Sequence, residues 1–211
     1  MRGPIEFYFD FMSPFGYLGS VEIERVAARH GREVDWRPIL LGVTVLKAMG
    51  LPPIPTIPLK GPWLDRDRER LSSLLDIPVR KHGLRGVNSL VAARAFLWIK
   101  ARDAALAKRF GQAVFARLWT RGEDITPVEA VLAEAAKLGV DARELGAALE
   151  TPELKADLRN AVDAAMAKGV FGAPFFICDG EGFFGVDHVW MLEHWLRHGH
   201  FNPARGERAG G

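Results

Sequence analysis

Residues 5–20, which read IEFYFDFMSPFGYLGS, decide the fold. Apolar and polar side chains alternate over residues 5–11, and this period of two, with its aromatic content, predicts a β-strand. Ser13 and Pro14 follow directly, in the order that favours an N-cap residue and the first residue of a helix. A strand is therefore expected to pass straight into a helix, with a serine at the turn between them.

The residues that follow complete a β-α-β unit. The helix is expected to end at Gly31, because glycine is favoured just beyond a helix C-terminus. Residues 33–41, EVDWRPILL, predict a second strand, in which Pro38 indicates an edge position or a bulge. Two strands joined through a helix are expected to be parallel, with a right-handed crossover.

The middle of the chain has a different pattern. Residues 50–62, GLPPIPTIPLKGP, are too rich in proline for a regular helix and predict a linker or a binding loop. Roughly the next hundred residues are apolar at helical spacing. Further helix starts are predicted at Thr126-Pro127, Asp141 and Thr151-Pro152.

The C-terminal part returns to the strand pattern. Residues 173–186, APFFICDGEGFFGV, predict two short strands around the turn residues DGEG. A closing helix is expected next, with Asp187 as its N-cap. Pro174 lies just before the first of these strands, where a cis-proline would expose the backbone of the preceding residue to a ligand. The alternative is an ordinary trans proline at a sheet edge.

The order of the elements is β-α-β, then helices, then β-β-α. This order describes an α/β protein with a thioredoxin-like fold, in which a central mixed sheet is flanked by helices and carries an all-helical insertion. We expect a thioredoxin-like domain formed by residues 1–50 and 168–202, a helical insertion domain over residues 51–167, and a flexible tail over residues 203–211.

Composition narrows the classes of function. The 211 residues carry a formal net charge of +2 and show no basic tract with interleaved aromatic residues, so nucleic-acid binding is not expected. No apolar run approaches the roughly 18 residues that cross a bilayer, and the N-terminus lacks a signal-peptide pattern. We therefore expect a cytoplasmic protein that does not act at a membrane. The single cysteine, Cys178, excludes an intramolecular disulfide and a multi-cysteine metal site, and a buried structural role is expected for it.

The turn at Ser13 lacks the cysteines of a redox protein. In a thioredoxin-like oxidoreductase this turn carries Cys-x-x-Cys, whereas here it reads Ser13-Pro14-Phe15-Gly16. A helix N-terminus still offers free N–H groups and about half a positive charge, so it stabilises an anion. If a bound thiol cofactor takes the place of the cysteine, Ser13 can donate its proton to the thiolate and lower the thiol pKa by about one or two units. The alternative is that Ser13 only caps the helix.

Five segments, in chain order, extend this pattern: FDFMSPFGYLGS, RPILLG, VNSLVAARAFLW, KGVFGAPFF and FFGVDH. Together they resemble the 2-hydroxychromene-2-carboxylate isomerases, bacterial relatives of kappa-class glutathione transferases in the DsbA-like branch of thioredoxin folds. The resemblance implies a homodimer that uses glutathione to interconvert 2-hydroxychromene-2-carboxylate and trans-o-hydroxybenzylidenepyruvate. In that reaction a thiolate adds to the conjugated enone, the former double bond rotates, and elimination frees the thiol.

The same resemblance implies roles for individual residues. Ser13 corresponds to the serine that holds the glutathione sulfur, and Ala173 and Pro174 correspond to the cis-proline pair whose backbone meets the cysteinyl unit. Asn88 corresponds to an asparagine near sulfur and substrate, although it is equally suited to be an N-cap. Lys60 corresponds to a lysine that meets a carboxylate, although taken by itself it resembles a solvated lysine.

Two departures from the family pattern concern the ends of the site. Asp187 and His188 stand where the family has an Asp-Arg pair at the γ-glutamyl end, and histidine lacks the bidentate fork of arginine. Trp63 stands where the family often has a tyrosine, and with Phe15 it is expected to line an apolar pocket for an aromatic substrate, core packing being the alternative. The charge run DRDRER, residues 65–70, is most simply a solvated helix face, although an arginine there could meet a substrate carboxylate.

Two other functions compete with a glutathione-dependent isomerase. A kappa-like transferase would release a conjugate and consume glutathione, whereas the isomerase recycles it. A non-catalytic thioredoxin-fold module would bind peptides beside Pro174 and would bind glutathione weakly.

Overall fold

The computed structural model describes residues 3–80, 84 and 86–201, and the predicted tail over residues 203–211 lies outside them. Within the described residues, the centre of the protein is a four-stranded mixed sheet in the order β2-β1-β3-β4. β1 runs parallel to β2 and antiparallel to β3, which is antiparallel to β4. The strands are β1 (Ile5–Phe9), β2 (Val34–Pro38), β3 (Phe175–Cys178) and β4 (Glu181–Phe184). The predicted thioredoxin-like sheet is confirmed, with β2 and its Pro38 at an edge.

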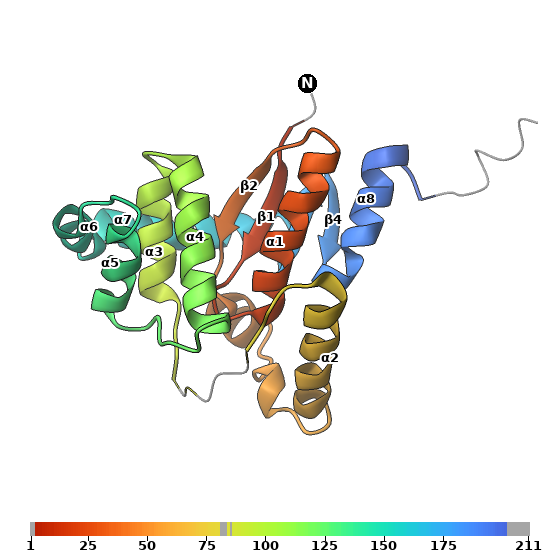
Figure 1. The fold of residues 1–211 in the computed structure, drawn as a ribbon, viewed down its shortest axis with the longest axis horizontal. Coiled ribbons are helices and arrows are strands. Elements are labelled where there is room, and N and C mark those ends of the chain that lie inside the picture. Colours follow the sequence, from red (N-terminus) through yellow and green to blue (C-terminus); the bar gives the residue numbers. More distant parts are fainter. Residues whose placement is uncertain (1–2, 81–83, 85, 202–211) are drawn as a thin grey trace, which may run out of the picture.

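Helices surround this sheet (Figure 1). α1 lies in front of it, α8 lies beside β4, α2 lies below α1, and α3 to α7 gather beyond β2. The α-helices are α1 (Pro14–Arg29), α2 (Lys60–Leu75), α3 (Leu90–Lys100), α4 (Ala104–Trp119), α5 (Val128–Ala136), α6 (Ala142–Leu149), α7 (Pro152–Ala167) and α8 (Val189–His198). Shorter turns are η1 (Gly42–Ala48), η2 (Ile54–Thr56) and η3 (Val186–His188). The division of the chain at residues 51 and 168 into domains stays a prediction.

The alternation of β1 places its aromatic side chains in the main core. The ring of Phe7 stacks on Phe176 with a centroid distance of 5.3 Å and meets Trp36 edge-on at 5.0 Å. The opposite face of β1 is not solvated, because residues of α7 pack against Tyr8. Asp10, which follows on that face, is also buried. A sheet covered on both faces leaves this carboxylate without solvent, so it requires hydrogen-bond donors from the protein.

The structure confirms two of the three predicted helix starts in the insertion. Asp141 and Thr151 accept N–H groups from the first turns of α6 and α7. The prediction at Thr126 is wrong: α5 begins at Val128 with Pro127 at its N-cap position and no side-chain cap. The Thr126 hydroxyl instead accepts the backbone N–H of Asn88 at 3.0 Å, so a contact between distant segments replaces the local one.

Ion pairs of Glu193 connect α8 to the C-terminal end of α1. The Glu193 carboxylate lies 3.1 Å from Arg29, 3.1 Å from His30 and 2.9 Å from Arg197. The hydrogen bond from Arg29 is the largest cause that holds the pKa of Glu193 at about 2, against an ordinary value of 4.5. A lowered pKa of this kind means that the ionised carboxylate stabilises the folded state.

Acid is therefore expected to weaken this contact over a defined range. The stabilisation by Glu193 is complete above about pH 5 and is lost as the pH falls through the folded pKa of about 2. Because Arg29 and Arg197 are half exposed, solvent screening limits the effect to about 1–2 kcal/mol. Urea denaturation should show Glu193→Gln less stable than the wild type at pH 6, with the difference vanishing near pH 2. A difference that stays constant over this range would contradict the assignment.

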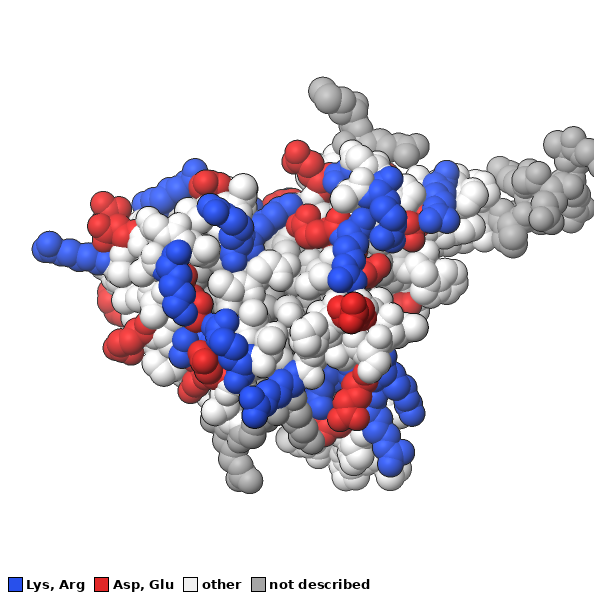
Figure 2. Space-filling view, viewed as in Figure 1, with Lys and Arg blue, Asp and Glu red and all other residues white. Residues whose placement is uncertain are grey.

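None of the helices in the described part of the chain is long and apolar enough to cross a lipid bilayer. Basic and acidic side chains are interspersed over the face shown in Figure 2, as expected for a formal net charge of +2.

Candidate functional site

Ser13 occupies the turn between β1 and α1. It is the N-cap of α1, where its Oγ accepts the backbone N–H of Gly16 at 2.9 Å. The same hydroxyl donates to the backbone carbonyl of Ala173 at 3.0 Å, across 160 residues of sequence. The side chain is buried, with 5 % exposed. The predicted cap is confirmed, and the hydroxyl proton is directed away from the helix toward the segment before β3.

The segment opposite Ser13 carries the predicted cis-proline. The peptide bond between Ala173 and Pro174 is cis, and the Pro174 carbonyl accepts the backbone N–H of Gly185 at 2.9 Å. Gly185 opens the turn that contains Asp187. Hydrogen bonds therefore connect Ser13, the cis-proline segment and the turn before α8, which the sequence pattern had associated only through the resemblance.

Gly19 lets α1 approach this proline closely. A Cβ at Gly19 would lie 3.0 Å from the Cβ of Pro174 and 3.2 Å from the ring of Phe176. Gly19→Ala is expected to destabilise the protein by about 1–3 kcal/mol, because overpacking would shift the proline segment. Gly146→Ala is the matched control in α6: its nearest neighbour would lie at 3.5 Å, and a gain of up to about 1 kcal/mol is expected from helix propensity. Equal effects in urea denaturation would contradict the close contact.

A buried carboxylate lies beneath the Ser13 turn. Asp10 accepts the backbone N–H of Met12 at 2.9 Å, that of Leu41 at 2.7 Å and the hydroxyl of Ser89 at 2.6 Å. Burial raises the pKa of Asp10, and these three hydrogen bonds oppose that rise. The carboxylate ties together the turn, the segment after β2 and the start of α3. The sequence analysis missed it, although a polar residue that ends an apolar strand directly before Ser-Pro is a usable signal.

Asn88 lies exposed before α3. Its side-chain oxygen accepts the N–H of Leu90, the first residue of α3, at 3.2 Å. Ser89 holds the formal N-cap position but makes no cap bond, since its hydroxyl goes to Asp10. Asn88 therefore performs the capping that was its alternative role, and its contact with glutathione or substrate stays a prediction.

Lys60 and Trp63 open α2, and both are exposed. The preceding Leu59 has a φ of 68° and is 88 % exposed, while the Lys60 N–H reaches back to the Pro58 carbonyl at 2.9 Å. This is a strained three-residue turn, a feature that clusters at ligand sites. Trp63 is 55 % exposed, so core packing does not account for it. Among the described residues, no hydrogen bond joins Lys60 or Trp63 to Ser13. Phe15, in the first turn of α1, is half-buried against the main core.

The prediction that Asp187 caps the closing helix is wrong. α8 begins at Val189, and Asp187 lies one turn earlier in η3, where its side chain makes no cap bond. Both Asp187 and His188 are exposed, and His188 Nδ1 lies 2.8 Å from the Phe184 carbonyl. Burial, followed by the nearby charge of Asp187, raises the pKa of Asp67 in α2. The charge of the Asp187 carboxylate thus acts on a second carboxylate, in α2.

Cys178 takes no part in this arrangement. Its side chain is fully buried in β3, and burial is the largest cause that raises the pKa of its thiol to about 11. The predicted burial of Cys178 is confirmed, and its structural role stays a prediction. Among the described residues, no group of three or more His, Cys, Asp or Glu side chains is arranged to hold a metal ion.

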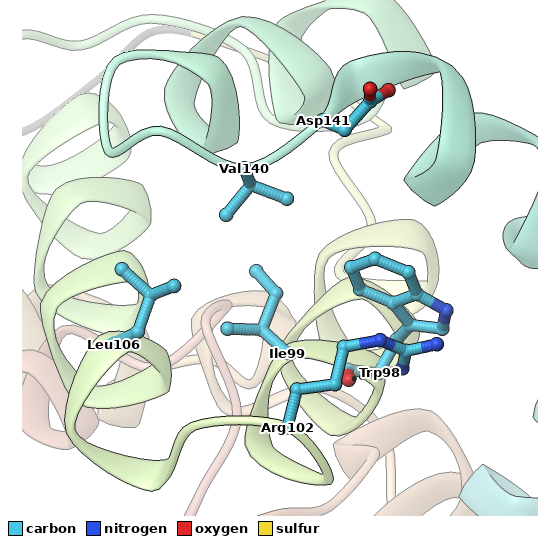
Figure 3. A pocket seen from close by; sticks show the side chains of 6 residues that line it. All are labelled: Trp98, Ile99, Arg102, Leu106, Val140 and Asp141. Atoms are coloured by element: carbon cyan, nitrogen blue, oxygen red, sulfur yellow. Dashed lines mark hydrogen bonds between the residues drawn. The ribbon is translucent and has the colours of Figure 1, made fainter.

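Two hollows lie away from Ser13. One, of about 190 Å³, lies in the helical region (Figure 3), where Arg102 stacks on Trp98 at 3.5 Å and Asp141 already caps α6. The other, of about 270 Å³, lies against β2, where Arg37 and Lys100 are paired with Asp35. Their charged groups are engaged within the protein, and neither hollow contains a helix N-terminus that faces a cis-proline.

Comparisons with known proteins identify the family and agree with the fold. The family model of the DSBA-like thioredoxin domain matches residues 4–197. Glutathione S-transferase kappa 1 of Homo sapiens is 29% identical over 204 residues, covering 91% of this chain and 90% of its own length. The 2-hydroxychromene-2-carboxylate isomerase of Sphingobium xenophagum is 29% identical over 201 residues, covering 93% of this chain and 99% of its own length.

Solved structures show the same likeness. A 2-hydroxychromene-2-carboxylate isomerase superposes with a TM-score of 0.82 and 25% identity, covering 92% of this chain and 94% of its own. The cytosolic disulfide reductase DsbM of Pseudomonas aeruginosa, solved with GSH, has a TM-score of 0.65 and 16% identity, covering 92% of this chain and 96% of its own, and shows the shared fold.

Proposed function

The chain belongs to the DsbA-like thioredoxin family, and from this premise we propose that it is a glutathione-dependent isomerase of the 2-hydroxychromene-2-carboxylate type. It would interconvert 2-hydroxychromene-2-carboxylate and trans-o-hydroxybenzylidenepyruvate, or act in the same way on a similar aromatic enone acid. The observation that carries the proposal is the Ser13 hydroxyl, placed at a helix N-terminus and 3.0 Å from the carbonyl before the cis-proline. Relatives named as isomerases and as kappa transferases support it.

The residues of the site fit glutathione. We propose that Ser13 holds the sulfur, that the backbone of Ala173 beside Pro174 pairs with the cysteinyl unit, and that Asp187 meets the γ-glutamyl ammonium. His188 would lie at that same end. When bound, glutathione supplies a thiolate that adds reversibly to the conjugated double bond and so permits its rotation.

Ser13 has to exchange one hydrogen-bond partner to do this. In the free protein its hydroxyl donates to the Ala173 carbonyl and accepts from Gly16. With a sulfur anion at the turn, we expect the proton to be donated to the sulfur, because a charge-assisted hydrogen bond is about twice as strong as a neutral one. The Ala173 carbonyl is then available to accept an N–H from the ligand. The bond from Gly16 keeps the serine in position throughout.

The aromatic acid would lie between the start of α2 and the start of α3. We propose that Lys60 and Asn88 meet its oxygens and stabilise developing enolate charge, and that Trp63 and Phe15 contact its ring. We propose that Lys60 and Asn88 also border glutathione, since the resemblance gives each of them both contacts. A cytoplasmic location and a homodimer are part of the proposal, and light scattering measures the latter.

An assay that follows substrate turnover and the concentration of free thiol in the same sample tests this proposal. Purified protein is mixed with catalytic glutathione and an excess of 2-hydroxychromene-2-carboxylate, and both isomerisation and free thiol are followed. The isomerase converts many equivalents of substrate per glutathione with no loss of thiol. A kappa-like transferase, the second candidate because the human relative is equally similar, loses one thiol per product. Absence of both turnover and glutathione binding at millimolar concentration would favour the non-catalytic binding module.

A further inference from the structure

Arg68 is a buried arginine in the charge run of α2. It is only 5 % exposed, whereas Arg66 and Arg70 on the same helix are exposed. The interpretation of residues 65–70 as a solvated face is therefore wrong at this position. The reason is helical spacing, because Arg68 lies three and seven residues before Leu71 and Leu75, which pack against the main core.

The inward face of α2 meets α1, the helix that begins at Ser13. The two helices pack together, and the Leu75 carbonyl accepts a hydrogen bond from Arg25 of α1 at 2.8 Å. Arg68 shares that face with Leu75. Arg68 therefore lies on the side of α2 that is turned toward the core and toward the helix whose N-terminus forms the candidate site.

One edge of the Arg68 guanidinium makes no hydrogen bond within the described residues. Its Nη1 donates to Asp65 at 3.0 Å. Its Nη2 lies 3.7 Å from Glu69, beyond hydrogen-bond distance, and the Glu69 side chain is 71 % exposed. Its Nε is buried and has no hydrogen-bond partner among the described residues. Nε and Nη2 lie on the same edge of the planar group, and this pair of donors matches the two oxygens of a carboxylate.

Asp67, the residue before Arg68, indicates which ligand carboxylate the arginine would bind. After burial, the charge of Asp187, in the turn before α8, is the next cause that raises the pKa of Asp67. In the view of Figure 1 the upper end of α2 is drawn near the lower end of α8. Two carboxylates that repel each other favour a cation bound near both. The γ-glutamyl unit of glutathione carries one ammonium and one carboxylate on the same carbon atom. The carboxylates of Asp67 and Asp187 can bind the ammonium. The Nε and Nη2 donors of Arg68 can bind the carboxylate.

We propose that Arg68 binds the α-carboxylate of the γ-glutamyl unit and so replaces the family arginine for which this chain has His188. The inference rests on the proposed use of glutathione. It identifies a specificity-determining residue on α2, outside the Asp187-His188 turn. It also explains a buried guanidinium whose Nε has no partner in the described part of the chain.

Calorimetry with two thiol ligands tests this inference. Glutathione and cysteinylglycine, which lacks the γ-glutamyl unit, are titrated into the wild type, Arg68→Met, Arg68→Lys and the control Arg66→Met. We expect Arg68→Met to weaken glutathione binding about 10- to 100-fold while cysteinylglycine binding changes less than about twofold. Arg68→Lys should lie between, because it keeps the charge but loses the fork. Adding His188→Arg to Arg68→Met should recover part of the lost affinity.

Several results would overturn the inference. If Arg68→Met reduces the folded fraction of the protein, the apparent affinities for glutathione and cysteinylglycine fall equally. An equal loss of affinity for both ligands therefore means that Arg68 has only a structural role. An unchanged glutathione affinity with a raised KM for the aromatic acid would assign the arginine to the substrate. A wild type that binds no glutathione would instead remove the proposed function itself, and this inference with it.

Discussion

Replacing Ser13 by alanine is expected to lower kcat/KM for isomerisation by about 10²- to 10³-fold, the effect of losing one donor to a developing or bound anion. The pKa of the bound glutathione thiol should rise by about one or two units, because the charge-assisted hydrogen bond to the thiolate is gone. The ultraviolet absorbance of the thiolate, followed against pH, measures this shift directly. The cap bond to Gly16 is lost as well, which should cost about 1 kcal/mol in the free energy of unfolding.

Ser20 supplies the matched control. It is also a buried serine of α1, and its hydroxyl donates to the Tyr17 carbonyl at 2.6 Å within the helix. Ser20→Ala should leave the thiol pKa unchanged, whatever it does to stability. If Ser13→Ala also leaves the thiol pKa and the rate unchanged, Ser13 is a helix cap and nothing more.

Asp10→Ala is expected to be the most destabilising polar substitution near the site, by about 3–5 kcal/mol. Two backbone N–H groups and the Ser89 hydroxyl would be left buried without their acceptor. Asp10→Asn keeps the shape but turns an NH2 group toward donors, so we expect a smaller loss of about 1–3 kcal/mol. Urea denaturation at neutral pH measures both values.

Asp103→Ala is the control for Asp10. Asp103 caps α4 by accepting the Leu106 N–H at 2.8 Å at an exposed position, so its loss should cost only about 1 kcal/mol. If Asp10→Ala proves no more destabilising than Asp103→Ala, the three segments are held together by packing and not by the buried carboxylate.

Much of the site could be predicted because its signals are local. Ser13-Pro14 predicts a helix start from two adjacent residues. The position of Pro174 before a strand left cis and trans open, and the family resemblance implied the cis peptide bond that the structure shows. The misplaced caps at Thr126 and Asp187 have a common cause. Each of these residues has the chemistry of a cap. Thr126 instead contacts Asn88 across 38 residues, and Asp187 lies within the short helical turn η3 that precedes α8.

The sequence by itself determined the order of strands and helices, the turn that carries Ser13 in place of a cysteine, and the absence of dithiol chemistry there. These follow from periodicity, capping and residue identity, which act over a few residues. Only the tertiary structure decided which polar groups meet, such as Ser13 with Ala173 and Asp10 with Ser89. It also decided that Arg68 is buried. The physical reason is that such contacts depend on how helices pack against the sheet, and a charged residue shows the same local pattern whether its helix face is covered or open.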